Sequence, residues 1–188
     1  MKARESGMPE EAMWNGLFNV ENILKTMGIN NKIKNIVDFG CGYGTFTIPI
    51  AERIHGRVYA LDIEPEMVKT TERKTEEKGL GNIEVMLRDF ISSGSGLEDG
   101  SVDYVMLFNI LHLDNPMNLL KEAYRILKKG GKLGIIHWNY DPTTPRGPSM
   151  NIRPKPEQVI KLVTSSRFNY PRKYDLKPYH YGIFAVKT

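Results

Sequence analysis

The residues best suited to chemistry in this sequence are one aspartate and three glycines near position 40. They form the pattern D-x-G-x-G-x-G, in which Asp38 stands two residues before Gly40 and is followed by Gly42 and Gly44. Glycine lets a backbone turn tightly and approach a ligand without a side-chain clash. A carboxylate beside such a turn favours a ligand that carries positive charge. The dinucleotide pattern G-x-G-x-x-G would need a glycine at position 45, where the chain has Thr45, so the spacing argues against NAD.

Two more acids follow later apolar runs. Asp62 ends the run that begins at Arg57, and Asp89 comes shortly after the run Ile83–Leu87. A carboxylate can accept hydrogen bonds from two hydroxyl groups. Taken singly, such an acid more often caps a helix or faces water, and a glycine cluster after a strand is often a plain turn. The order of the glycines and acids along three consecutive predicted strands is what indicates a binding site.

These acids and glycines fall at the ends of predicted strands. Apolar runs typical of strands buried on both faces occupy Ile33–Phe39, Arg57–Leu61, Ile83–Leu87, Val102–Phe108 and Lys132–Trp138. Start and stop signals predict a helix from Glu64-Pro65 to Gly79 and another from Asn115-Pro116 to Gly130. Strands that alternate with helices predict right-handed crossovers and a mostly parallel sheet with helices on both faces.

The two ends of the chain complete the predicted fold. Apolar residues at helical spacing predict one covering helix over Glu10–Met27. Near the other end, a short helix over Pro156–Ser165 precedes two β-rich stretches, Arg172–Lys177 and Tyr179–Lys187, with only Pro178 between them. So tight a connection favours an antiparallel hairpin. The expected fold class is α/β: a Rossmann-like, doubly wound mixed sheet, mostly parallel, with an antiparallel C-terminal hairpin strand and helices on both faces.

The glycine pattern, with one acid at the end of the second strand and another after the third, resembles class I S-adenosylmethionine-dependent methyltransferases. The likeness runs from about Lys34 to His137 and includes the openings of the fourth and fifth strands, Ser101–Val105 and Leu127–Leu133. The segment Phe108–Asp114 looks most like the ubiquinone/menaquinone-type small-molecule methyltransferases. The resemblance implies S-adenosylmethionine as the methyl donor, S-adenosylhomocysteine as the product, and transfer to an unidentified small-molecule acceptor by in-line displacement.

The same resemblance assigns roles to individual residues. The donor-binding residues that it implies are Asp38, Gly40, Cys41, Gly42, Gly44, Asp62, Ile63, Asp89, Phe90 and Asn109. Asp62 would bind the ribose hydroxyls, and Asp89 would meet the adenine amino group beside a backbone amide near Phe90. Asn109 would lie near the methionine end. His112 is the candidate general base, because a histidine titrates near neutral pH, with a structural hydrogen-bonding role as the alternative.

Several residues outside this core have two interpretations. A proline-rich loop after the fifth strand offers Arg146 and Arg153 to a carboxylate or phosphate of the acceptor, unless it is only a surface connection. Trp138 and Tyr140 either pack this loop or touch the acceptor. Trp14 and Phe18 either close over the donor site or pack in the core. We expect His55 and His180 to be structural or exposed.

The only cysteine, Cys41, and the segment Asn109–His112 narrow the chemistry. One cysteine cannot form an internal disulfide or a zinc site, and it does not supply the thiols that cytosine C5 and arsenic methyltransferases need. We expect Cys41 to be a small turn residue without chemistry, and we expect no metal site. The Asn/Asp-Pro-Pro-aromatic motif of enzymes that methylate nucleobase amines is missing at Asn109–His112. Two alternatives stay open: a donor-binding module or sensor without turnover, and an NAD-dependent oxidoreductase.

We expect a single domain over 1–188, with an N-terminal covering helix (1–31), a donor-binding core (32–138) and an acceptor-side loop, helix and hairpin (139–188). No apolar run approaches the roughly 18 to 20 residues of a membrane span, and the first residues lack the apolar segment of a signal peptide. We therefore expect a cytoplasmic protein with a small-molecule acceptor and no membrane contact. A net charge of +4 is far from that of a dedicated nucleic-acid binder. The oligomeric state is left open.

Overall fold

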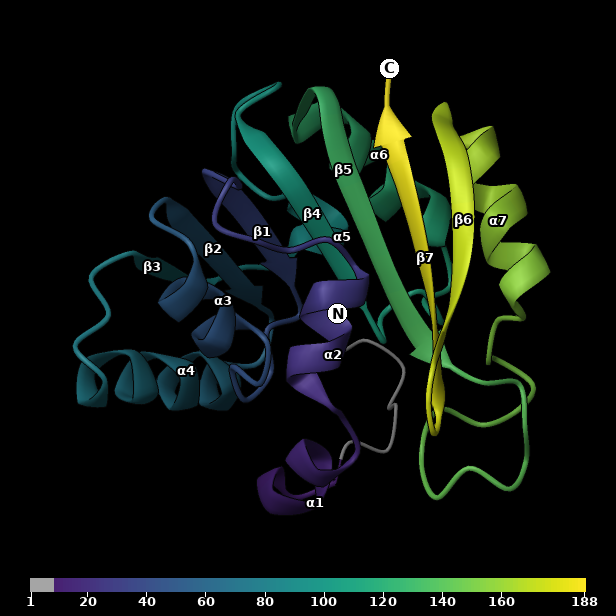
Figure 1. The fold of residues 1–188 in the computed structure, drawn as a ribbon, viewed down its shortest axis with the longest axis horizontal. Coiled ribbons are helices and arrows are strands. Elements are labelled where there is room, and N and C mark those ends of the chain that lie inside the picture. Colours follow the sequence, from purple (N-terminus) through teal and green to yellow (C-terminus); the bar gives the residue numbers. More distant parts are fainter. Residues whose placement is uncertain (1–8) are drawn as a thin grey trace.

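The computed structural model describes residues 9–188, which build a seven-stranded sheet with helices on both faces (Figure 1). The strands are β1 (Asn35–Phe39), β2 (Arg57–Asp62), β3 (Ile83–Leu87), β4 (Val102–Phe108), β5 (Leu127–Trp138), β6 (Phe168–Leu176) and β7 (His180–Lys187). The helices are α1 (Glu11–Gly16), α2 (Val20–Thr26), α3 (Thr47–Arg53), α4 (Pro65–Glu77), α5 (Phe90–Ser93), α6 (Pro116–Ile126) and α7 (Pro156–Ser165). Residues 1–8 of the predicted N-terminal part lie outside the described residues.

The sheet has the predicted class. Its strands lie in the order β3-β2-β1-β4-β5-β7-β6. Strands β1 to β5 run parallel, whereas β7 is antiparallel to both β5 and β6. The turn at Lys177-Pro178 is too short for a parallel crossover, so β6 and β7 form the predicted hairpin. No helix within residues 9–188 has the length and apolar character needed to cross a membrane.

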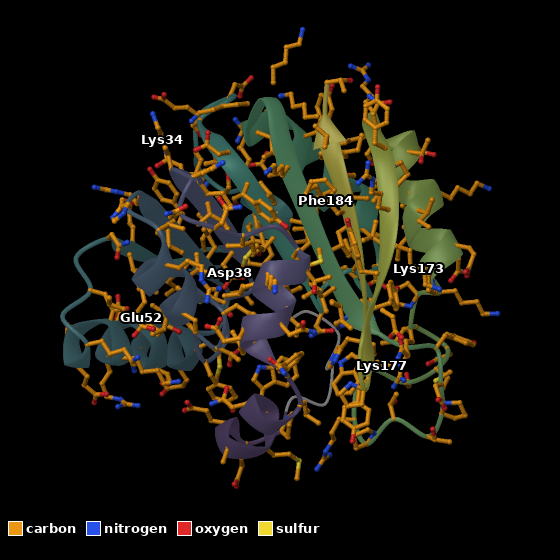
Figure 2. The ribbon with its side chains drawn as sticks, viewed as in Figure 1. Lys34, Asp38, Glu52, Lys173, Lys177 and Phe184 are labelled. Carbon is orange, nitrogen blue, oxygen red and sulfur yellow. The ribbon has the colours of Figure 1, made fainter. Side chains whose placement is uncertain are left out.

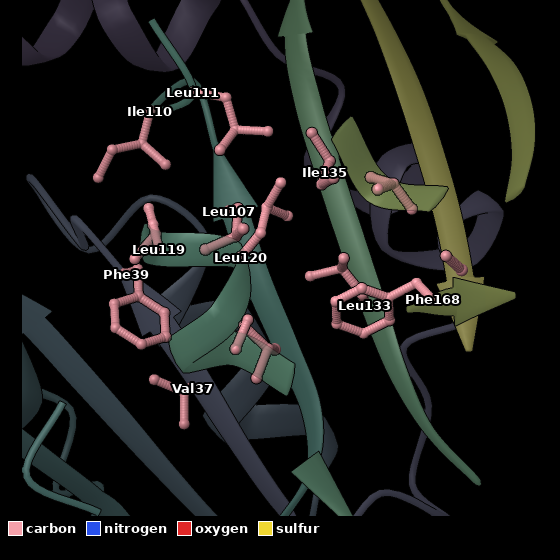
Figure 3. Close-up of a cluster of buried hydrophobic side chains, with 14 of the residues drawn as sticks. Val37, Phe39, Leu107, Ile110, Leu111, Leu119, Leu120, Leu133, Ile135 and Phe168 are labelled. Carbon is pink, nitrogen blue, oxygen red and sulfur yellow. The ribbon is translucent and has the colours of Figure 1, made fainter. Parts of the chain in front are cut away.

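Apolar side chains on both faces of the sheet fix the strands relative to one another. On one face, the buried stripe of α6, which includes Leu120 and Ala123, packs in one cluster with Leu107 of β4 (Figure 3). On the other face, Leu24 of α2 and Ile50 of α3 belong to a second buried cluster. Because both faces are covered, most residues of the central strands β1 and β4 are buried, and a ligand can approach them at their ends.

The predicted single helix over Glu10–Met27 is wrong, because two short helices, α1 and α2, replace it. Leu17 and Phe18 leave the helical path and are buried in the core. The side chain of Asn19 then accepts a hydrogen bond from the backbone N–H of Asn22 at 3.1 Å and so caps α2. Asparagine is among the best helix N-caps, so the break is encoded where the apolar spacing alone predicts continuity.

The predicted end of the helix before the fifth strand is also wrong. Helix α6 ends at Ile126 and β5 begins at Leu127, so Gly130 lies inside the strand instead of terminating the helix. Leu127 pairs with β4, and the Lys128 ammonium lies 2.8 Å from a carboxylate oxygen of Asp103. These contacts to β4 hold the chain extended directly after α6, and β5 therefore starts earlier than the apolar run indicates.

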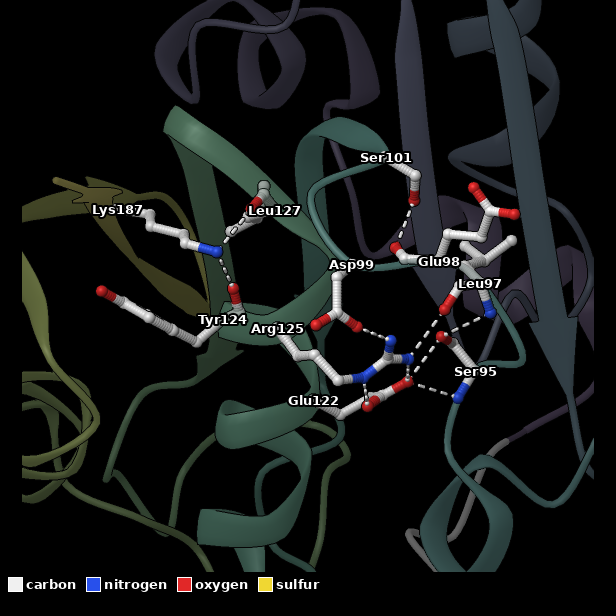
Figure 4. Close-up of polar contacts among 10 residues, drawn as sticks. All are labelled: Ser95, Leu97, Glu98, Asp99, Ser101, Glu122, Tyr124, Arg125, Leu127 and Lys187. Atoms are coloured by element: carbon white, nitrogen blue, oxygen red, sulfur yellow. Dashed lines mark hydrogen bonds and ion pairs between the residues drawn. The ribbon is translucent and has the colours of Figure 1, made fainter.

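Glu122 of α6 is the centre of a polar network that joins this helix to the segment before β4 (Figure 4). Its carboxylate accepts hydrogen bonds from the backbone N–H and the hydroxyl of Ser95 at 2.7 and 2.6 Å. Arg125 donates to the same carboxylate at 2.8 and 2.7 Å and also to the carbonyl of Leu97. Burial opposes the charged form of Glu122, but these hydrogen bonds outweigh it and lower its pKa to about 2.

We expect Glu122→Gln to lower the free energy of unfolding by about 1–3 kcal/mol at pH 7, because it removes hydrogen bonds to a charged, half-buried acceptor. The pKa of Glu122 is lower in the folded than in the unfolded chain. The loss should therefore be full above the usual value of 4.5 and shrink as the pH falls toward 2. Urea unfolding at pH 7 and pH 3 measures it. Glu98→Gln, at an exposed site, is the matched control; equal losses in both variants would contradict the role of the network.

Candidate functional site

The glycine loop lies where the strand order reverses. Strand β1 sits between β2 and β4, and the loop from Gly40 to Gly44 follows β1. In open α/β sheets, ligands bind outside the carboxyl ends of the strands at such a point. Asp62 ends β2 and Asn109 follows β4, so the structure brings both predicted site residues to the two sides of the loop.

Asp62 holds the glycine loop in place. One carboxylate oxygen accepts the backbone N–H of Gly42 at 2.8 Å, and the other accepts the N–H of Glu64 at 3.0 Å. The N–H groups of Gly40 and Cys41 both donate to the carbonyl of the residue before Asp62, at 2.8 and 3.0 Å. Gly40 has a φ of +76°, and an added Cβ would lie 3.0 Å from the side chain of Ile110. The loop is therefore fixed to β2 on one side and packed on the segment after β4 on the other.

Asp38 lies inside the fold and is only 3% exposed, whereas the labelled charged side chains of Lys34 and Glu52 lie on the outside (Figure 2). Its carboxylate accepts a hydrogen bond from the hydroxyl of Thr47 at 2.6 Å. Burial raises the pKa of Asp38 to about 7, the Thr47 hydrogen bond lowers it in part, and the charge of Asp62 adds to the rise. A cation bound nearby would favour the charged form, so the pair of acids fits a ligand with positive charge.

The end of β2 and the end of β3 offer a polar and an apolar surface side by side. Burial raises the pKa of Asp62, and the hydrogen bonds from Glu64 and Gly42 oppose the rise. A carboxylate has about four lone-pair positions, so each oxygen of Asp62 can still accept a hydroxyl. Leu87 pairs with Asp62 in the register of β2 and β3 and is 57% exposed, and Ile63 is half-buried. The two side chains offer an apolar surface next to the Asp62 carboxylate. Only Ile63 was predicted, although Leu87 directly precedes Arg88 and Asp89.

The two predicted residues after β3 behave differently. Asp89 is half-buried and caps α5, because one of its carboxylate oxygens accepts the N–H groups of Ile91 and Ser92 at 3.2 and 3.1 Å. Hydrogen bonds from the Ser92 side chain and backbone lower the pKa of Asp89. The Phe90 side chain does not reach the site: it is 4% exposed and packs edge-on against Phe39 in the core, with ring centroids 5.2 Å apart. Only the backbone of Phe90 can therefore take part in binding.

The loop is also supported from α4, by residues that no sequence motif marks. Thr71 is fully buried and donates its hydroxyl hydrogen bond to the carbonyl of Gly42 at 2.9 Å. Lys74 donates to the carbonyl of Tyr43 at 2.5 Å. Burial raises the pKa of the Cys41 thiol well above its usual value, so the thiol stays protonated at neutral pH. The predicted role of Cys41 as a turn residue without chemistry agrees with this environment.

Asn109 and His112 lie where the predicted methyl-transfer end would be. Asn109 has a φ of +55°, which is uncommon for a residue other than glycine, and strained backbone of this kind clusters at functional sites. Its backbone N–H donates to the carbonyl of Ile136 at 2.7 Å, which places it beside β5. The His112 ring is buried and meets the ring of His137 edge-on, with centroids 5.6 Å apart. The structure thus brings the candidate base to the ends of β4 and β5.

The interpretation of Arg153 as a ligand for an anion is wrong. The residue is 7% exposed, and its guanidinium donates to the backbone carbonyls of Asn139, Asp141 and Pro148 at 2.8 to 3.0 Å. Its donors are used to fold the proline-rich loop, so the loop is a built structure rather than a plain connection. Arg146 remains exposed. Trp138 is buried, so it packs the start of this loop, whereas Tyr140 is exposed and lies under the Lys155 ammonium. Of the two histidines predicted to be structural or exposed, His180 is fully buried and His55 is exposed.

The N-terminal segment touches both the glycine loop and the core. Phe18 is buried and packs edge-on against Trp14 and Phe46, with ring centroids 4.9 and 5.2 Å apart. Asn15 of α1 accepts a hydrogen bond from Thr45 of the loop at 2.7 Å. Core packing is therefore the structural role of Trp14 and Phe18, and α1 reaches the loop through polar contacts.

We expect Asp38→Asn to change how stability depends on pH. The folded chain holds the Asp38 proton more tightly than the unfolded chain, so the stabilisation from the protonated carboxyl is full below its usual pKa of 3.8 and is lost as the pH rises through about 7. The free energy of unfolding of the variant, relative to wild type, should rise by about 2–3 kcal/mol from pH 5 to pH 8. Urea unfolding across this range measures it, with Asp175→Asn at an exposed site as control. Parallel pH profiles of wild type and Asp38→Asn would refute the buried acid.

Comparison with known proteins agrees with this geometry. Residues 36–131 match the family model described as methyltransferase domain. The demethylmenaquinone methyltransferase of Geobacillus sp. (strain WCH70) is 33% identical over 116 residues, which are 60% of this chain and 48% of that protein. The chain therefore spans about half the length of the curated relatives that it matches.

Two solved structures show how far the fold extends. A SAM dependent methyltransferase from Aquifex aeolicus is 25% identical and superposes with a TM-score of 0.84 over 95% of this chain and 94% of that chain. The [4+2]-cyclase SpnF superposes with a TM-score of 0.78 over 100% of this chain and 84% of that chain, but at 15% identity it shares the fold alone. The whole described fold, hairpin included, has counterparts in known structures.

Proposed function

We propose that this chain, which belongs to the methyltransferase domain family, transfers a methyl group from S-adenosylmethionine to a small-molecule acceptor. The observation that carries the proposal is the Asp62 carboxylate, which holds the glycine loop across the carboxyl ends of β1 and β2 within the segment that matches the family. The Aquifex aeolicus structure, a SAM dependent methyltransferase, supports the same donor, and the demethylmenaquinone methyltransferase relatives support a small acceptor. We also place the reaction in the cytoplasm, as the sequence predicts.

The residues at the site would divide the work of holding the donor. Asp62 would accept the ribose hydroxyls, Ile63 and Leu87 would pack on the adenine ring, and Asp89 would receive the adenine amino group. Asn109 would border the methionine part of the donor, and the glycine loop would contact the same part. The donor supplies a methyl group already activated by its sulfonium, so the protein has to bind it, align the acceptor and exclude water.

Proton removal from the acceptor is the remaining task, and we propose His112 for it. The ring lies near Asn109 in the chain and against His137, at the edge where the methyl group would be delivered. A neutral imidazole can take a proton near neutral pH. His112→Gln should lower kcat by about 10²–10³-fold while the affinity for S-adenosylhomocysteine stays unchanged. Equal kcat values in the variant and the wild type would leave His112 with a structural role only.

Formation of S-adenosylhomocysteine in the presence of an acceptor tests the proposed activity. The purified chain would be incubated with S-adenosylmethionine and a panel of phenols, quinols, amines, RNA and protein. Turnover with a small molecule supports the proposal, and turnover with RNA or protein alone contradicts it. Binding of S-adenosylhomocysteine without turnover on any acceptor would instead indicate a sensor, and binding of NADH would indicate an oxidoreductase.

We expect Asp62→Asn to weaken S-adenosylhomocysteine binding about 10- to 100-fold, because the negative charge is lost and one of the two acceptor oxygens, each of which holds a backbone N–H, becomes a donor. Isothermal titration calorimetry measures the affinity. Asp175→Asn, an exposed acid on β6, is the matched control and should bind like wild type. Equal affinity in the Asp62→Asn variant would rule out the assigned role of this carboxylate.

A further inference from the structure

A groove separate from the glycine loop runs along α7 and is called here the α7 groove. It has a volume of about 710 Å³ and is lined by α7, by the start of α6 and by the proline-rich loop after β5, which Figure 1 shows next to α7. On α7 the lining extends from Lys155, directly before the helix, to Ser165, its last residue. Pockets of roughly 300–1,000 Å³ hold small organic ligands, so the α7 groove has the size of a ligand site.

Apolar side chains from three elements line the groove. Pro116 begins α6, Ile152 belongs to the proline-rich loop, and Leu162 lies on α7. All three are only half-buried, so part of their apolar surface faces water. Covering such surface with an apolar group is favourable, roughly in proportion to the area removed from water. The α7 groove therefore offers binding free energy to a ligand with an apolar body.

Two lysines bring positive charge to the same groove. Lys155 and Lys161 both line it and are exposed, and neither forms an ion pair within the described part of the chain. The Lys155 ammonium lies 4.6 Å from the centre of the Tyr140 ring, which also lines the groove and is 43% exposed. A contact of this kind holds the ammonium beside the ring and leaves its charge in place.

The charged side chains of the lining have one sign. Among the residues of 9–188 that line the groove there is no acid, and the third cation is Arg153. Its hydrogen bonds go to loop carbonyls, but an arginine keeps its charge. The acids that are near in sequence, Asp114, Asp141 and Glu157, do not line the groove. The Asp141 carboxylate accepts the N–H and the hydroxyl of Thr143 instead. A concave surface with charges of one sign attracts ligands of the opposite sign.

We propose that the α7 groove binds an organic anion in which an apolar body carries a group such as a carboxylate. The apolar body lies on the apolar lining, and the anionic group meets the ammonium groups of Lys155 and Lys161. The proline-rich loop thus serves an anion through these lysines and not through the donors of Arg153. The inference goes beyond the proposed methyl transfer, because the groove contains none of the residues assigned to the donor.

Matched naphthalene probes test the charge preference. The probes are 2-naphthoate, 2-naphthamide and 2-naphthylmethylammonium, which share one apolar body, and their fluorescence is followed at pH 7. Wild type should bind 2-naphthoate about tenfold more tightly than the neutral amide, and more tightly still than the cation. Acetate at the same concentration should not displace 2-naphthoate, because it lacks the apolar body.

Lysine variants locate the bound probe. Lys155→Gln and Lys161→Gln should each weaken 2-naphthoate binding about threefold, and the double variant should remove the preference over the amide. Both side chains are exposed, so the variants should keep the unfolding temperature and the affinity for S-adenosylhomocysteine. The control is the double variant Lys32→Gln and Lys34→Gln, which changes the net charge equally at exposed sites before β1 and should bind the probes like wild type.

The outcomes separate this inference from the proposed function. Equal affinity of wild type for 2-naphthoate and 2-naphthamide overturns the inference, as does a preference that persists without Lys155 and Lys161 or disappears in the control. Displacement of 2-naphthoate by acetate would indicate a site for bare anions, and displacement by S-adenosylhomocysteine would place the probe in the donor site; either result also overturns it. A chain that does not bind S-adenosylhomocysteine contradicts the proposed function, while the probe affinities still decide the groove.

Discussion

The hydrogen bond between the Asp62 carboxylate and the Gly42 amide is the interaction on which the candidate site depends. It joins the end of one strand to the loop that follows another, and the second oxygen of the same carboxylate orients the start of α4 through Glu64. From that helix, Thr71 returns to the carbonyl of Gly42. The amide and the carbonyl of a single glycine are thus held by two different elements, so the loop has one shape before any ligand arrives. A preformed loop reduces the ordering cost of binding.

Folding of the site carries a cost in free energy, because polar and ionisable side chains are buried there. Burial raises the pKa of the Asp38 carboxyl to about 7, and both ring nitrogens of His180 are buried without a hydrogen-bond partner in the described part of the chain. The hydrophobic clusters on both faces of the sheet contain no comparable cost. Sites that bind or react commonly sacrifice stability that the scaffold restores elsewhere. The covered central strands are what allow the strand ends to carry these unfavourable groups.

Sequence reasoning reaches the parts of the site that depend on strand ends. An apolar run that stops at an acid, as at Asp62, fixes both the strand and the position of its last side chain, and β3 and β4 match their predicted bounds. Sequence reasoning fails where a side chain donates hydrogen bonds to the backbone of its own loop. The Arg153 guanidinium has the chemistry to bind an anion, but it donates to backbone carbonyls of its own loop. Backbone carbonyls occur at every residue, so no sequence pattern predicts this use. The direction of Phe90, into the core, likewise depends on packing against Phe39 from another strand.

The position of β7 between β5 and β6 has a consequence for how the chain folds. β5 has twelve residues, and its outer side is covered only by β7, which starts more than forty positions later in the chain, at His180. Until the chain between β5 and β7 folds back and β7 pairs with β5, this edge of β5 is exposed and can pair with another molecule. Contacts this distant in sequence slow folding, so the interval is long compared with that of local structure. The hairpin therefore covers the aggregation-prone edge of β5 only late in folding. Conditions that delay its docking should favour association of partly folded chains through β5.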